Sequence, residues 1–186
     1  MARKTRNDWV EAGIEVLAQQ GAHALTIDRL AERLGVTKGS FYHHFKNQAD
    51  YRDALLANWE ERGMAGMPAT PTTVAEALAT LDRIVEASPV GTDRDRGMAI
   101  RFWATQDPLV RAYVERVDAQ RLAFAGDVLT VVVGDRDRAR FLGGMLYALL
   151  LGSGHMLPSA DHETMLEFYE EFKRLLVADE GAADTD

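Results

Sequence analysis

Apolar residues recur at three- and four-residue spacings along most of the chain, which is typical of amphipathic helices. Glycines and caps divide the first part of this pattern into short segments, because Gly21 and Gly35 each follow a run of helical spacing. The one β-branched run, residues 130–133, closes a long helical pattern, so we interpret it as the last turn of a helix. The amino-terminal pattern predicts three short helices, over residues 10–21, 27–34 and 37–45.

The helical pattern continues after residue 50 and breaks in the Gly- and Pro-rich stretch 63–71. We expect a hinge or a domain junction there. Beyond this stretch the spacing predicts helices over 74–87 and 98–105. A longer helix begins at Pro108, and its roughly 25 residues correspond to about 38 Å. The sequence therefore predicts an all-α fold.

The last two helical segments, near 141–150 and 165–176, are apolar over so wide an arc that one neighbouring helix could hardly cover them. Part of this surface is expected to contact a second copy of the chain, since a monomer would leave it exposed to water. The alternative is that both helices cover the core of their own domain. The predicted dimer contacts are Leu142, Met145, Leu146, Leu149, Phe168, Phe172 and Leu175.

Composition narrows the function without identifying it. The 186 residues contain no cysteine, which excludes disulfide frameworks, thiolate nucleophiles and cysteine metal sites. No run is apolar enough for a signal peptide or a spanning helix, so we expect a cytoplasmic protein with no membrane partner. Net charge is −8, but residues 1–46 hold seven Lys and Arg against five Asp and Glu, whereas residues 47–186 hold 14 against 24. Only the amino-terminal part is suited to approach phosphate.

Residues 26–45 are the informative stretch. Two short helices joined by a tight turn at Gly35 and Val36 form the layout of a helix-turn-helix. The second helix begins with Thr37, Lys38, Gly39 and Ser40, which are short or flexible and would let its backbone enter a DNA major groove. Phe41 and Phe45 lie four residues apart and are expected to turn inward as anchors. The polar side chains are then left facing outward as candidate DNA contacts.

This region closely resembles the DNA-binding domain of the TetR family of transcriptional regulators. The resemblance covers residues 9–60 and is carried by Gly21, Leu25-Thr26, Leu30-Ala31, Leu34-Gly35-Val36, Lys38 to Tyr42, His44-Phe45, Asn47 and Leu55. Beyond Glu60 the likeness is architectural. The resemblance implies a homodimer that binds a pseudo-palindromic double-stranded DNA operator, with a carboxy-terminal helical domain for ligand binding and dimerisation.

Carried over residue by residue, the resemblance assigns DNA contacts to eight residues. Two positions depart from the family pattern. Asp28 stands where the family often has a residue able to touch DNA, and its charge would repel phosphate. Gln48 and Ala49 replace the lysine and acid that commonly follow Asn47. The expected contacts are Thr26, Thr37, Lys38, Gly39, Ser40, Tyr42, His43 and Lys46.

From these features we expect a helix-turn-helix domain over residues 1–48, with its reading helix at about 37–45. A helical ligand-binding and dimerisation domain would follow over 49–178, and a disordered acidic tail over 179–186. Bulky and polar-tipped residues in the second domain favour a pocket for a largely apolar small molecule, although each of them could be ordinary core. The candidate pocket residues are Trp59, Met98, Phe102, Trp103, Gln106, Tyr113, Phe124, Tyr147 and His155.

Catalytic and metal-binding patterns are missing from the sequence. The segment beginning His162-Glu163 resembles the start of a zinc-protease motif, but Leu166 occupies the position of the second histidine. We therefore expect no metal and no cofactor. The sequence predicts a ligand-responsive transcriptional regulator, most readily a repressor. The alternatives are a helical small-molecule carrier or enzyme with a vestigial DNA-binding head, and a nonspecific DNA binder, which would need a basic chain.

Overall fold

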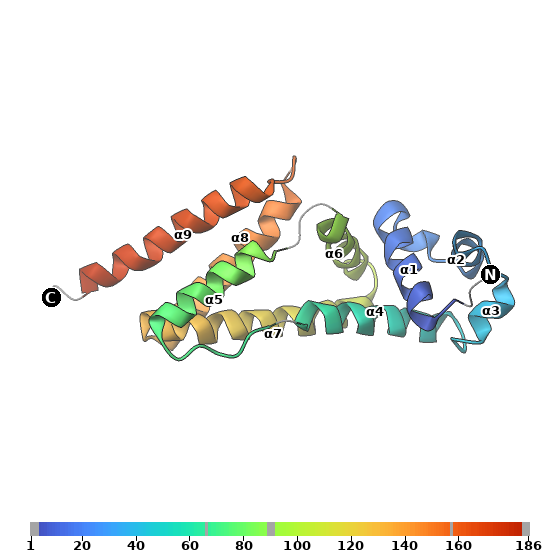
Figure 1. Cartoon of the computed structure of the whole chain (residues 1–186), viewed down its shortest axis with the longest axis horizontal. Coiled ribbons are helices and arrows are strands. Elements are labelled where there is room, and N and C mark those ends of the chain that lie inside the picture. Colours follow the sequence, from blue (N-terminus) through green and yellow to red (C-terminus); the bar gives the residue numbers. More distant parts are fainter. Residues whose placement is uncertain (1–3, 66, 89–91, 157, 184–186) are drawn as a thin grey trace. The chain divides into compact units, whose positions relative to one another are not determined.

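The computed structural model describes residues 4–65, 67–88, 92–156 and 158–183, and every regular element within these ranges is a helix (Figure 1). The prediction of an all-α fold is confirmed. The elements are α1 Arg6–Gln20, the 3₁₀ turn η1 Ala22–Ala24, α2 Ile27–Leu34, α3 Lys38–Tyr42, α4 Gln48–Met64, α5 Val74–Glu86, α6 Thr92–Ala104, α7 Pro108–Val133, α8 Arg136–His155 and α9 His162–Ala183.

Two helix ends differ from the sequence prediction. The reading helix α3 ends at Tyr42 rather than near Phe45, because the chain must turn to reach the extended backbone of Asn47, which caps α4. At the other end of the chain, α9 continues to Ala183 and so includes the first five residues of the segment predicted to be disordered, 179–183. The prediction of a disordered tail itself stays a prediction. Residues 184–186 of the predicted tail lie outside the described ranges.

The chain divides into two compact units, and their boundaries differ from the domain division expected from the sequence. Unit 1 comprises residues 1–66 and 91–117, and unit 2 comprises residues 67–90 and 118–186. The expected boundary at residue 48 would separate α4 from the first helices. Instead, Tyr51, Leu55 and Leu56 of α4 are buried in the same core as Trp9 of α1. Ile100 of α6 and Val110 of α7 also belong to this core.

The core of unit 1 depends on a close approach between α1 and α4 at Gly13. A Cβ atom at this position would lie 1.8 Å from the hydroxyl oxygen of Tyr51, so only glycine leaves room for that ring. The Tyr51 hydroxyl, which is buried, donates a 2.8 Å hydrogen bond to the backbone carbonyl of Trp9. Burial also raises the pKa of Tyr51 above its ordinary value. Tyr51 therefore joins α4 to α1 through both packing and a satisfied polar contact.

Ion pairs connect the surface of unit 1. Glu15 of α1 binds Arg33 of α2 at 2.7 Å through one carboxylate oxygen and lies 3.6 Å from Arg96 of α6 through the other. Arg116 of α7 makes two 2.9 Å hydrogen bonds to the carboxylate of Glu60 in α4. The bidentate geometry of this second pair is the stronger arrangement for an arginine and a carboxylate.

Unit 2 has its own core, formed by buried side chains of α5, α7, α8 and α9 that include Leu81, Leu129, Leu146 and Phe172. The backbones of α7 and α8 approach closely at Gly143, where an added Cβ would lie 3.1 Å from the amide nitrogen of Gly126.

A polar cluster joins α5 to α9 in unit 2. The Tyr169 hydroxyl and the Lys173 ammonium both donate to one oxygen of Asp82, at 2.8 and 3.0 Å. Burial and the bond to Asp82 raise the pKa of Tyr169.

Within the described part of the chain, no helix is both long enough and apolar enough to cross a bilayer.

Candidate nucleic-acid interface

The helix pair α2 and α3 is defined by its caps and its turn. Thr26 begins α2 by accepting a hydrogen bond from the backbone N–H of Arg29 at 3.4 Å. Gly35 ends α2 in the left-handed conformation, with φ of 66°, which glycine adopts without steric cost. The N–H of Val36 then bonds the carbonyl of Ala31 at 3.0 Å, and α3 begins two residues later. This is the helix-turn-helix layout that the sequence predicts.

Buried aromatic rings fix the orientation of α3. Phe41 and Phe45 are almost completely buried, and their ring centroids are 5.1 Å apart. Phe41 also contacts Trp9 edge-to-face at 5.3 Å, and Phe45 contacts Tyr51 edge-to-face at 5.0 Å. Because Phe41 anchors one side of this five-residue helix and Phe45 anchors the segment that follows it, the opposite side of α3 is held toward solvent.

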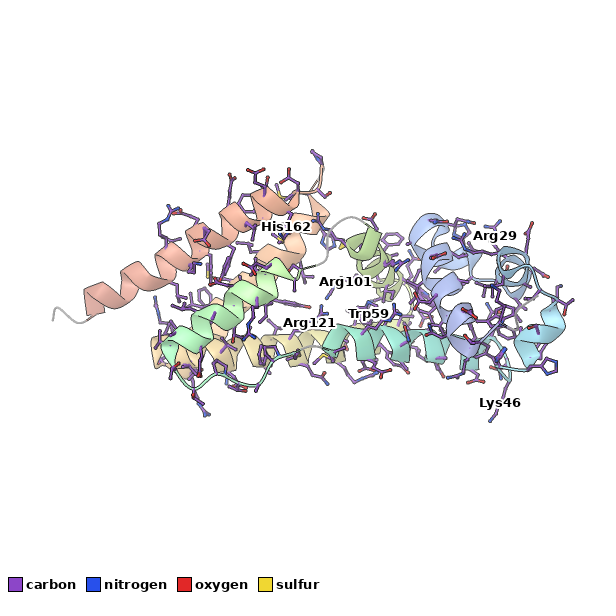
Figure 2. The ribbon with its side chains drawn as sticks, in the orientation of Figure 1. Arg29, Lys46, Trp59, Arg101, Arg121 and His162 are labelled. Atoms are coloured by element: carbon purple, nitrogen blue, oxygen red, sulfur yellow. The ribbon has the colours of Figure 1, made fainter. Side chains whose placement is uncertain are left out.

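The eight predicted DNA contacts all reach the surface of unit 1. Seven are exposed, and Ser40 is half-buried. The ring of Tyr42 is 59% exposed, although it packs edge-to-face on the buried ring of Phe41. Lys46 extends from the loop between α3 and α4 (Figure 2). No bound nucleic acid tests their roles, so these contacts stay predictions.

The first turn of α3 carries groups that the fold itself does not use. Thr37 stands at the N-cap position, but its side chain makes no capping hydrogen bond. Gly39 is exposed, and a Cβ added there would meet only the Thr37 hydroxyl, at an ordinary contact distance of 3.6 Å. An exposed glycine in a helix costs about 1 kcal/mol relative to alanine. Packing within the chain does not require a glycine at position 39. A glycine there is consistent with a surface that another molecule approaches closely.

The positive charges near α3 differ in how they are held. Arg29 and Arg33 of α2 point back to α1, where their guanidinium groups bond Gln20 and Glu15. The ammonium of Lys38 forms an ion pair with Asp28 of α2, and both side chains are about two-thirds exposed. The departure from the family pattern at Asp28 therefore has a structural partner on the same surface as the predicted contacts.

Sequence reasoning missed the residues that hold the loop after α3. The backbone N–H of Lys46 bonds Asp50 at 2.8 Å, and Asn47 caps α4 through the N–H of Asp50 at 2.9 Å. Arg6 lies 4.9 Å above the ring of Phe45 and 3.6 Å from Asp50. Gln48 donates a 2.7 Å bond to the carbonyl of Leu25, which gives this family departure a structural role. The capping signal of Asn47 followed by Asp50 was available in the sequence, whereas these long-range contacts were not.

The candidate pocket residues are divided between the two units. In unit 1, Trp59, Trp103 and Tyr113 pack against the core, Met98 is half-buried, and Phe102 and Gln106 are exposed. In unit 2, Phe124 packs against the core and the Tyr147 hydroxyl donates to Asp118 at 2.7 Å. His155 is exposed and its Nδ1 lies 2.8 Å from the carbonyl of Leu151. A separate hollow of about 300 Å³ in unit 1 is lined by other residues: Val16, Gln20, Arg29, Glu32 and Arg33.

The predicted dimer contacts do not all remain available to a partner. Leu146 and Phe172 are buried in the core of unit 2, so their assignment to the dimer surface is corrected: their side chains fill the space between the helices of one chain. Leu142 and Leu149 pack partly against the same core. The exposed members are Met145, Phe168 and Leu175, to which the structure adds Phe141 at 69% exposure. In the described ranges no group of three or more His, Cys, Asp or Glu is placed to hold a metal ion.

Comparisons with known proteins agree with this geometry. Residues 10–55 match the family model of bacterial regulatory proteins of the tetR family. Over 55 residues the chain is 38% identical to the class D tetracycline repressor protein of Escherichia coli, a match that covers 30% of this chain and 25% of the repressor. Matches to curated relatives span 23 to 42% of those proteins, so the likeness in sequence is confined to the amino-terminal region.

The likeness in fold extends over nearly the whole chain. The TetR-family transcriptional regulator SCO4454 from Streptomyces coelicolor has a TM-score of 0.72 at 21% identity, covering 94% of this chain and 88% of the regulator. The multidrug binding protein EbrR, solved with malachite green, has a TM-score of 0.64 at 22% identity, covering 91% and 98%. This chain is thus similar to the tetR family of bacterial regulatory proteins over residues 10–55, and similar in fold to a solved regulator over nearly its whole length.

Proposed function

We propose that the protein is a sequence-specific DNA-binding transcriptional regulator that acts as a homodimer, and that a small molecule releases it from its operator. The observation that carries this proposal is the first turn of α3, where an unused threonine hydroxyl, an open glycine and a lysine are exposed together. The aromatic rings of Phe41 and Phe45 hold the opposite side of the helix in the core. A helix fixed in this way presents its amino-terminal side chains to a major groove.

In this proposal the eight predicted residues divide by the part of DNA they contact. Lys38, Gly39 and Ser40 face base edges, which specify sequence, whereas Tyr42, His43 and Lys46 contact the phosphate backbone, which sets position. Thr26 and Thr37 lie beside phosphates at the helix starts. Two copies of α3 would occupy successive major grooves of a pseudo-palindromic site, with centres about 34 to 36 Å apart.

The exposed apolar side chains of α8 and α9 support the homodimer. Phe141 and Met145 are four residues apart on α8, and Phe168 and Leu175 are seven apart on α9, so each pair shares one helix face. Four large apolar groups left in water at one pair of packed helices are typical of a surface that a second subunit covers. An isologous contact through this surface would make a closed dimer.

A largely apolar effector is the ligand class that this proposal assigns. The structurally similar multidrug binding protein EbrR was solved with malachite green, and the class D relative is named as a tetracycline repressor. We infer that the aromatic residues predicted for the pocket contact such a ligand in this chain. Binding would favour a dimer geometry that no longer matches the operator, with a coupling free energy of about 1 to 3 kcal/mol.

The test is fluorescence anisotropy of the purified protein on the intergenic DNA beside its own gene, with a scrambled duplex of equal length and at one stated salt concentration. Binding at least about a thousandfold tighter to the intergenic DNA supports a specific regulator. If that DNA binds no better, selection from a random duplex pool provides the second probe. A pool that yields no enriched sequence contradicts the proposal.

A further inference from the structure

Among the described residues, Asp28 is the acidic side chain that forms an ion pair with a predicted base contact, Lys38. It lies in the first turn of α2, and its carboxylate binds the ammonium of Lys38, the first residue of α3. Both side chains are exposed, at 67% and 63%, so neither is held in place by burial. Exposed ion pairs contribute little to stability. The pair therefore adds little to the stability of the fold. We expect its main effect on the affinity of Lys38 for DNA.

In the free protein the pair withdraws Lys38 from phosphate. Nonspecific DNA binding comes almost entirely from cations that neutralise phosphates, whatever the sequence. A lysine that is already neutralised by a carboxylate contributes little to that attraction. The carboxylate itself also repels a phosphate that approaches the same surface. Both effects weaken binding to any DNA.

Binding to a matching base is affected differently. A lysine ammonium has three donors, so it can keep one on Asp28 while another reaches an acceptor on a base edge. The acceptors of guanine in the major groove are neutral, so the Asp28 carboxylate repels them far less than it repels phosphate. The ion pair also limits the directions in which the long lysine side chain can point. Its cost therefore falls mainly on the nonspecific complex.

We propose that Asp28 is a specificity-determining residue that acts through Lys38, by lowering the affinity for nonspecific DNA more than the affinity for the operator. This inference rests on the proposed function, because it assumes that α3 reads DNA. Asp28 is a positioning residue in this scheme and need not touch the operator.

The test compares Asp28→Asn with the unchanged protein on two probes: a scrambled duplex, and the sequence that the unchanged protein enriches from a random duplex pool. Asparagine keeps the shape and removes the charge. We expect affinity for the scrambled duplex to rise about eightfold near 0.1 M salt, the factor for one extra phosphate contact when the slope is about −0.9 per contact. Affinity for the enriched sequence should rise by less than half of that factor.

The salt dependence shows whether Asp28 acts through Lys38. On the scrambled duplex, Asp28→Asn should steepen the slope of log K against log salt by about 0.9, and most of this change should be lost when Lys38→Met is also present, leaving only the direct repulsion between Asp28 and phosphate. Glu61→Gln, which removes the same charge near the far end of α4, is the matched control and should change the slope much less. Thermal unfolding of each variant identifies any loss of fold.

Three results would overturn the inference. The affinity for scrambled DNA could stay unchanged in Asp28→Asn, it could rise equally on both probes, or the slope change could persist undiminished with Lys38→Met. A selection that enriches no sequence contradicts the proposed function, and this inference with it. An enriched sequence together with an inert Asp28→Asn contradicts the inference alone.

Discussion

The two units of this chain use different means to fix their helices. In unit 1 a glycine on α1 receives the hydroxyl end of Tyr51, and four aromatic rings lock α1, α3 and α4 together. In unit 2 the helices meet through largely aliphatic side chains, the polar cluster at Asp82 and one close backbone contact at Gly143, and large apolar groups remain exposed on α8 and α9. The core of unit 1 therefore depends on one specific ring contact at Gly13, whereas unit 2 leaves apolar surface exposed for a further contact.

The largest expected effect concerns Gly13. Gly13→Ala should lower the free energy of unfolding by about 3 kcal/mol, because the new methyl group would overlap the Tyr51 hydroxyl. Urea denaturation followed by tryptophan fluorescence measures it. Gly97→Ala in α6 of the same unit is the control: nothing lies within 4 Å of the added atom, so this change should stabilise by up to about 1 kcal/mol. Similar losses in both variants would show that Gly13 is not a special contact.

The proposed dimer surface on α8 and α9 of unit 2 gives the next effect. Leu175→Glu should weaken self-association by about 2 kcal/mol or more, because it would bury an unpaired charge between subunits. Analytical ultracentrifugation over a concentration series gives the dissociation constant. Val74→Glu on α5 adds the same charge at another exposed apolar residue and should leave the dimer intact. A fully dimeric Leu175→Glu protein would place the interface elsewhere.

Alkaline pH compares a buried tyrosine from each unit. The pKa values of Tyr51 and Tyr169 are both raised on folding, so the folded state retains these protons when the unfolded state loses them. The two tyrosines stabilise the folded state fully below about pH 10. Above that pH, the free energy of unfolding falls by about 1.4 kcal/mol per pH unit for each tyrosine. Urea denaturation between about pH 9 and about pH 11.5 measures the slope.

Phenylalanine variants assign that slope to the units. Tyr51→Phe should remove the part of the alkaline pH dependence that comes from unit 1. Tyr169→Phe should remove the part that comes from unit 2. Each change also removes one hydrogen bond at neutral pH, at a cost of about 1 kcal/mol for the buried acceptor of Tyr51 and less for Asp82, which is partly exposed and keeps Lys173. An unchanged alkaline slope in either variant would mean that the corresponding tyrosine does not control it.

The smallest effect tests the exposed surface of unit 1. Tyr42→Phe should weaken operator and scrambled DNA alike by about fivefold, because it removes one phosphate contact while the ring keeps its packing on Phe41. Lys38→Ala should instead reduce the preference for the operator. Anisotropy on both duplexes separates the two patterns. Full operator affinity in a folded Tyr42→Phe protein would remove Tyr42 from the interface.

The sequence was a better guide to local structure than to contacts between distant residues. Periodicity and caps located α2 to the residue, because Thr26 and Gly35 act on the backbone beside them. The roles of Gln48 and Tyr51 depend on partners 23 and 42 residues away, which no local pattern encodes. Likewise, wide apolar arcs indicated a partner for α8 and α9, but could not separate Leu146, which faces its own core, from Phe141, which does not.

The order in which the chain is synthesised has a consequence for unit 1. Its first 66 residues contain every predicted DNA contact, yet its core also needs Ile100, Ala104, Val110 and Val114, which the ribosome adds later. At translation rates of roughly 5 to 20 residues per second, the missing segment arrives about 3 to 10 seconds after the first 66 residues are complete. During that interval a nascent chain carries α3 on an unfinished core, so the proposed DNA-binding region completes its folding only after α5 has been made.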